Sequence, residues 1–199
     1  MAGALPAAAQ GAGPARTILV VGDSLSAEYG LQRGSGWVEL LARRLQATGQ
    51  DYQIHNSSIS GDTTSGGIAR LPDALEHYKP EIVILELGSN DALRGLSLDM
   101  TKNNLLRMVD MAQQAGARTL LVGMQIPPNY GRKYAERFRA LFAEVAEERR
   151  SGLVPFLLQG MATDKSLFQS DGIHPNEHAQ ARIEANVWKH LAPMLLAGH

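Results

Sequence analysis

The sequence contains no cysteine, and this absence excludes thiol catalysis and zinc sites built from thiolates. It also lacks any apolar run of about 18 residues, the shortest stretch that reads as a membrane-spanning helix. Charge of one sign is not in excess either, because 19 basic and 20 acidic residues leave a net charge of −1. Nucleic acids and anionic membranes attract strongly basic proteins, and this chain is not basic, so we expect no nucleic-acid partner. Because no long apolar run is present, we also expect no stable membrane insertion.

The 199 residues are 44% hydrophobic, which suits one compact domain that needs no metal or disulfide for stability. Residues 1–15 are different, because they are almost entirely Ala, Gly and Pro. Residues 5–10 resemble the small-residue end of a secretory signal peptide, although a flexible tail has the same composition. We therefore expect residues 1–15 to be a disordered tail or signal-peptide remnant of a periplasmic or secreted protein, followed by a single domain at 16–199.

Short apolar runs alternate with amphipathic stretches along this domain. The runs are rich in β-branched residues or alternate polar with apolar side chains, which predicts strands at 17–21, 51–55, 81–87, 119–124 and 153–156. Apolar residues at helical spacing predict helices around 37–45, 105–112, 138–145 and 183–191. This alternation indicates an α/β protein with three α/β/α layers and about five parallel strands in the flavodoxin-like order 2-1-3-4-5.

Polar, glycine-containing segments follow these strands, where ligands collect in a parallel sheet. They lie at residues 22–26, 60–64, 88–91 and 171–175. The last of them is expected to follow the fifth strand and to open the final helix. Since the carboxyl ends of parallel strands share one edge of the sheet, we expect these four segments to meet there.

One serine, one histidine and one aspartate in these segments have the chemistry of acyl transfer. The Ser24 hydroxyl is a weak nucleophile that needs a base within hydrogen-bond reach, and the His174 imidazole suits that task. Asp171, three residues before the histidine, is positioned to orient the ring and stabilise its charged form. We expect Ser24 to lie on a tight turn from strand to helix, with its N–H at the head of that helix.

Hydrolysis of an ester also needs donors aimed at the developing oxyanion. The Gly61 N–H is accessible because no Cβ stands in the way, and Asn90 offers a side-chain amide. With the Ser24 N–H, these groups form the expected oxyanion hole.

The four segments resemble the blocks of the SGNH, or GDSL, hydrolase family, which supply a serine, a glycine, an asparagine and a histidine. Here these residues are Ser24, Gly61, Asn90 and His174, in the family's order and across nearly the whole chain. Residues 22–27, 58–63, 69–72 and 129–132 are similar to its bacterial thioesterase and lysophospholipase (arylesterase) branch. The resemblance implies a periplasmic enzyme, without metal or other cofactor, that accepts aryl esters, acyl thioesters and lysophospholipids.

Other interpretations of these residues remain open. Ser24 also fits a helix cap, and Asp23, Asp62 and Asp91 could hold Mg²⁺, although hydrogen bonding to loop backbones is the preferred role for these aspartates. The same catalytic groups would serve a carbohydrate acetylesterase, and a flavodoxin-like scaffold could bind an anion without catalysis.

An acyl group needs an apolar wall beside the serine. The segments after the third and fourth predicted strands supply candidates, and another lies next to the histidine: Leu93, Ile126, Pro127, Tyr130 and Ile173. The expected partner is a small acyl ester or thioester, and the sequence leaves the oligomeric state open.

Overall fold

The computed structural model describes residues 16–196 and contains one five-stranded parallel sheet. Its order is β2-β1-β3-β4-β5, which confirms the predicted fold class and strand order. The strands are β1 (Arg16–Gly22), β2 (Tyr52–Asn56), β3 (Ile82–Glu86), β4 (Arg118–Val122) and β5 (Gly152–Val154). The expected tail or signal remnant at 1–15 lies outside the described residues.

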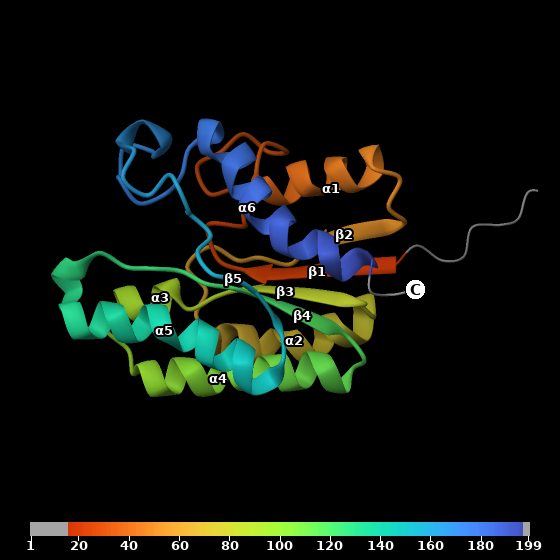
Figure 1. The fold of residues 1–199 in the computed structure, drawn as a ribbon, viewed down its shortest axis with the longest axis horizontal. Coiled ribbons are helices and arrows are strands. Elements are labelled where there is room, and N and C mark those ends of the chain that lie inside the picture. Colours follow the sequence, from red (N-terminus) through yellow and green to blue (C-terminus); the bar gives the residue numbers. More distant parts are fainter. Residues whose placement is uncertain (1–15, 197–199) are drawn as a thin grey trace, which may run out of the picture.

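Helices cover both faces of the sheet (Figure 1). Helices α1 (Trp37–Ala47) and α6 (Glu177–Leu196) lie on one face. The other face carries α2 (Thr64–Tyr78), α4 (Leu98–Gln114) and α5 (Arg132–Arg149), with the five-residue α3 (Ser89–Leu93) at the end of β3. Two short 3₁₀ turns, Pro128–Tyr130 and Lys165–Leu167, lie in loops. In residues 16–196, the apolar stretches of the helices are too short or too charged to cross a bilayer.

The core explains why the strands are continuous apolar runs. Every residue of β3 is buried, and so are the last five of β1, because each has helices above and below it. Such strands cannot alternate polar and apolar residues as a half-exposed strand does. The one charged exception in β3 is Glu86, which is 0% exposed.

Helix α2 was not predicted from the sequence. Leu71 and Leu75 are buried at helical spacing, but the helix also contains Gly66, Gly67 and Pro72, which disfavour helix formation. The Thr63 hydroxyl accepts a hydrogen bond from the Gly66 N–H and caps the first turn. Packing of the apolar stripe against the sheet and α4 therefore outweighs weak local propensity.

The fifth strand and its connection also differ from the expectation. The strand ends at Val154 instead of residue 156, because the Phe156 N–H does not continue the ladder to the chain that follows β4. The Leu157 N–H then donates to the Gly123 carbonyl and the chain leaves the sheet. Residues 155–176 separate β5 from α6, so the segment around His174 does not follow the strand directly.

Leu121 provides a test of the core. This side chain is fully buried in β4, between β3 and β5, so Leu121→Ala should lower the free energy of unfolding by about 2–5 kcal/mol. Urea unfolding followed by circular dichroism measures the change. The control Leu196→Ala removes a leucine that is 68% exposed and should change stability by less than about 0.5 kcal/mol. Equal effects of the two variants would contradict the described core.

Candidate active site

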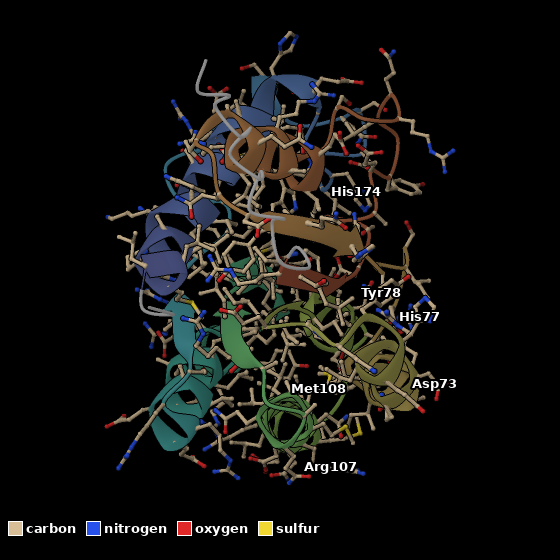
Figure 2. The ribbon with its side chains drawn as sticks, turned by 90° about the vertical axis from the view of Figure 1, so that its right-hand side faces the viewer. Asp73, His77, Tyr78, Arg107, Met108 and His174 are labelled. Carbon is tan, nitrogen blue, oxygen red and sulfur yellow. The ribbon has the colours of Figure 1, made fainter. Side chains whose placement is uncertain are left out.

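Three strand ends and one long loop meet at the carboxyl edge of the sheet. Ser24 lies two residues past β1, Gly61 follows β2, and Asn90 lies in the first turn of α3 after β3. The 155–176 segment brings His174 to the same place, next to the loop that follows β1 (Figure 2). The structure thus brings together the residues that the sequence indicated for catalysis.

A continuous row of hydrogen bonds links three of these side chains. The His174 Nε2 lies 3.0 Å from the Ser24 Oγ, and the opposite ring nitrogen, Nδ1, lies 2.6 Å from Asp171 Oδ2. Ser24 and His174 are partly buried, so a substrate can reach the hydroxyl. This geometry places the imidazole within proton-transfer distance of the serine.

Asp171 is fixed in its loop by backbone donors. Its Oδ1 accepts hydrogen bonds from the N–H groups of Ile173 and His174 at 2.8 and 2.9 Å. Burial opposes ionisation, but the hydrogen bonds from the His174 ring and these N–H groups prevail and lower the pKa of Asp171 to about 2. The ionised carboxylate favours a proton on Nδ1 of His174, which leaves Nε2 free to accept one.

The chain around Ser24 forms turns, and this corrects one expectation. The N–H groups of Ser26 and Ala27 both donate to the Asp23 carbonyl, but no helix begins between β1 and Trp37. The Ser24 N–H is therefore not at the head of a helix. The turn is instead held by the Asp23 carboxylate, which accepts from the Leu25 N–H at 3.0 Å.

Two backbone N–H groups at the site donate to no other group in the described part of the protein. Within residues 16–196, neither the Ser24 N–H nor the Gly61 N–H has a hydrogen-bond acceptor. Gly61 has φ +79°, a conformation that favours glycine, and its exposed backbone leaves room for a substrate oxygen. These N–H groups are therefore available to an oxyanion.

Asn90 is in a different state. Its Nδ2 donates both to Asp23 Oδ2, at 3.1 Å, and to the Asp62 carbonyl, at 2.9 Å. A primary amide has two N–H donors, so both are engaged. An oxyanion that binds Asn90 has to share or replace one of these acceptors, and the longer contact is the one to Asp23.

Charged side chains fasten the loop that carries Gly61. The Arg94 guanidinium donates to the Gly61 carbonyl at 2.8 Å, and Arg70 binds Asp62 Oδ2 at 2.8 Å and the Ser57 carbonyl. Asp91 accepts from the Thr64 backbone N–H and hydroxyl. The loop is thus tied to α2 and to the segment that follows β3.

The three aspartates considered for Mg²⁺ therefore all bind neighbouring protein groups. Asp23 holds Leu25 and Asn90, whereas Asp62 and Asp91 hold the Gly61 loop. Across residues 16–196, three or more His, Asp or Glu side chains nowhere gather in a way that could hold a metal ion. This is the hydrogen-bonding role that the sequence analysis preferred for these aspartates.

Beneath the serine turn lies a buried pair of carboxyl groups that the sequence analysis did not identify. Glu86 Oε2 accepts from the Ser26 hydroxyl at 2.7 Å and from the Asp23 N–H at 3.3 Å. Burial, partly offset by the Leu25 hydrogen bond, raises the pKa of Asp23 to about 6. Burial and the nearby Asp23 charge raise the pKa of Glu86 well above its usual value, which favours the neutral form of this carboxyl group.

The apolar candidates are divided between core and surface. Ile126 is 8% exposed and belongs to the core, and Leu93 packs partly against that core. Pro127, Tyr130 and Ile173 are exposed. A hollow of about 490 Å³ lies elsewhere, beside α1 and β2, and none of the catalytic candidates lines it.

Tyr29 is a further residue that the sequence analysis missed. Its ring centre lies 4.4 Å from that of His174, and the side chain is 50% exposed. No local pattern in the sequence marks it, because the contact joins two distant loops.

A parallel α/β sheet with a hydrogen-bonded serine, histidine and aspartate at its carboxyl edge is the arrangement of a serine hydrolase. The protein belongs to the GDSL-like lipase/acylhydrolase family, which matches residues 20–182. This confirms the resemblance inferred from the four sequence blocks.

Similar proteins are bacterial enzymes. "Esterase TesA" of Pseudomonas aeruginosa is 49% identical over 181 residues, covering 91% of this chain and 90% of that protein. "Thioesterase 1/protease 1/lysophospholipase L1" of Escherichia coli strain K12 is 39% identical over 184 residues, covering 92% and 87%. A crystal structure of TesA superimposes with a TM-score of 0.87 at 48% identity, covering 89% of this chain and 99% of that one.

The buried carboxyl pair predicts an unusual dependence of stability on pH. In an unfolded chain these groups titrate near pH 4, whereas in the fold the pKa of Asp23 is about 6 and that of Glu86 is raised. Above about pH 4 the folded state therefore binds more protons than the unfolded state. As a result, the free energy of unfolding contributed by the pair falls as the pH rises through about 6. Glu86→Gln cannot ionise, so its stability relative to the native protein should increase steadily across that range.

Urea unfolding at several pH values between about 4 and 8 measures this difference. The control Glu136→Gln changes a glutamate whose side chain is 69% exposed and should keep the native pH dependence. A stability difference between Glu86→Gln and the native protein that does not change with pH would disprove the raised pKa.

Proposed function

We propose that this protein hydrolyses carboxylic esters and acyl thioesters through an acyl-enzyme formed on Ser24. The observation that carries the proposal is the row of hydrogen bonds from the Ser24 hydroxyl through His174 to Asp171, with contacts of 3.0 and 2.6 Å. A carboxylate, an imidazole and a hydroxyl in this order are the parts that acyl transfer needs. Binding without catalysis would not require this alignment of the three side chains.

The reaction follows from the positions of these groups. Ser24 Oγ attacks the substrate carbonyl carbon while its proton moves to His174 Nε2. The imidazolium is stabilised by Asp171 and then gives the proton to the leaving oxygen or sulfur, so that the alcohol or thiol departs. His174 next takes a proton from water, the hydroxide attacks the acyl group, and the carboxylic acid is released as Ser24 regains its proton.

The oxyanion of each tetrahedral intermediate has donors nearby. The Ser24 and Gly61 N–H groups, unoccupied in the described part of the chain, are the first two. Asn90 is the third, after its amide shares or gives up the contact to Asp23. Donors held in place before the reaction stabilise the charge without reorganising solvent.

The substrates we propose are aryl esters, acyl thioesters such as acyl-CoA, and lysophospholipids. The exposed apolar side chain of Ile173, next to His174, supports this range, because an acyl chain needs an apolar surface near the serine. The names of the similar enzymes, which include an esterase and a thioesterase/lysophospholipase, support it as well.

Ser24→Ala tests the proposed nucleophile. Turnover of a p-nitrophenyl ester, an acyl-CoA and a lysophospholipid should fall on the order of 10⁶-fold, because the attacking oxygen is lost. A fluorophosphonate probe should label the native protein at Ser24 in the presence of EDTA and should not label this variant. The control Ser35→Ala removes an exposed hydroxyl that binds the Gln32 carbonyl and should behave as the native protein.

Hydrolysis retained by Ser24→Ala would reject the acyl-enzyme route. An acetylated sugar belongs in the same substrate panel, because preferential turnover of it would make the protein a carbohydrate acetylesterase with the same catalytic groups.

Asn90→Ala tests the oxyanion hole. The amide would stabilise charge that exists only in the transition state, so kcat should fall about 10²–10³-fold while KM changes little. Steady-state kinetics on an aryl ester gives both constants, and thermal unfolding verifies that the variant is folded. A rise in KM with an unchanged kcat would instead assign Asn90 to ground-state binding.

A further inference from the structure

The ring of Tyr29 lies against His174 in a contact that the proposed reaction does not otherwise explain. The ring centres are 4.4 Å apart and the planes are tilted by 40°. The tyrosine side chain is half exposed, so packing in the core does not account for its position. A large aromatic residue kept at the surface against a catalytic base suggests a role in the chemistry.

The backbone on either side of Tyr29 has an uncommon conformation. Glu28 has φ +57°, which non-glycine residues seldom adopt, and Gly30 has φ +71°. The Glu28 carboxylate compensates by accepting hydrogen bonds from the N–H groups of Gly34 and Gly36, at 3.0 and 2.7 Å. Unfavourable backbone conformations persist where the surrounding structure holds them, and they cluster at functional sites.

Hydrogen bonds tie Tyr29 to both sides of the active site. Its N–H donates to the Ser24 carbonyl at 3.4 Å, and its carbonyl accepts from Gln169 Nε2 at 2.8 Å. The Gln169 backbone N–H in turn donates to the His174 carbonyl at 2.7 Å. Gly30 allows this arrangement, because a Cβ there would lie 2.1 Å from the Gln169 Oε1.

We propose that Tyr29 is a positioning residue for His174, with its ring holding the imidazole in line with Ser24. The inference rests on the proposed function, because it assigns His174 as the base. The ring limits rotation of the imidazole about its side-chain bonds, so Nε2 stays directed at the serine hydroxyl. No bond to the tyrosine hydroxyl is needed, so the aromatic ring alone carries the effect.

The charged and polar groups around His174 act together with this ring. Asp171 faces Nδ1 and Ser24 faces Nε2, both within hydrogen-bond distance. The Asp23 carboxyl group, at the start of the serine turn, is close enough to interact with the His174 charge. All of these groups remain when Tyr29 is changed, so a difference between variants reports the ring.

The test compares Tyr29→Phe, which keeps the ring, with Tyr29→Leu, which removes it. Tyr29→Phe should match the native enzyme. Tyr29→Leu should lower kcat about 3–10-fold at neutral pH with little change in KM, because the imidazole loses its orientation.

The NMR chemical shift of the His174 ring protons provides a second measurement that needs no turnover. The signal should shift in Tyr29→Leu, which removes the aromatic ring 4.4 Å away, and stay near its native position in Tyr29→Phe. The signal is assigned by its loss in His174→Gln.

Tyr78 offers a matched control, because it stacks on His55 with ring centres 4.5 Å apart and lies away from His174 in Figure 2. Tyr78→Leu removes a similar tyrosine–histidine contact and should leave kcat, KM and the His174 ring signal unchanged. Native kcat and KM in Tyr29→Leu, with Ser24→Ala inactive, would overturn this inference while the proposed function stands. Activity in Ser24→Ala would instead reject the function itself.

Discussion

The hydrogen bond between the Ser24 hydroxyl and His174 Nε2 is the contact on which the rest of the site depends. Its two partners are 150 residues apart, and different parts of the fold deliver them. The sheet fixes Ser24 at the end of β1, whereas the irregular segment 155–176 returns His174 from the far edge. Gln169 and the loop after β1 then join the two sides, so the distance between hydroxyl and imidazole is set by the architecture as a whole.

Near this contact the protein buries polar groups that would be unfavourable in a core serving stability alone. Asp23 and Glu86 lie between two helical layers, and burying them costs free energy unless one is neutral and the other is hydrogen-bonded. In return, the Asp23 carboxyl group orients both the turn that presents Ser24 and the Asn90 amide. Arg70 and Arg94 give the Gly61 loop a similar support from the opposite side. The two halves of the site are therefore fixed before a substrate arrives.

Much of this arrangement was predictable because it follows from local patterns and sheet geometry. Apolar runs that end in glycine and polar residues specify parallel strands and the edge at which Ser24, Gly61 and Asn90 meet. Asp171 and His174 share one short loop, so their contact was expected too, although the catalytic roles of all five residues stay predictions. Helix α2 was missed because glycine and proline weaken its pattern, and the end of β5 because Leu157 instead of Phe156 bonds to Gly123 after the neighbouring strand. Glu86 and Tyr29 could not be found from sequence, since their surroundings arise only when remote segments pack together.

The location of Asp171 and His174 within one turn has a mechanical consequence. Because the two side chains share a loop and are joined through both ring and backbone, their mutual geometry is set within residues 171–174. Only the separation between the imidazole and the serine depends on how segment 155–176 docks against the loop after β1.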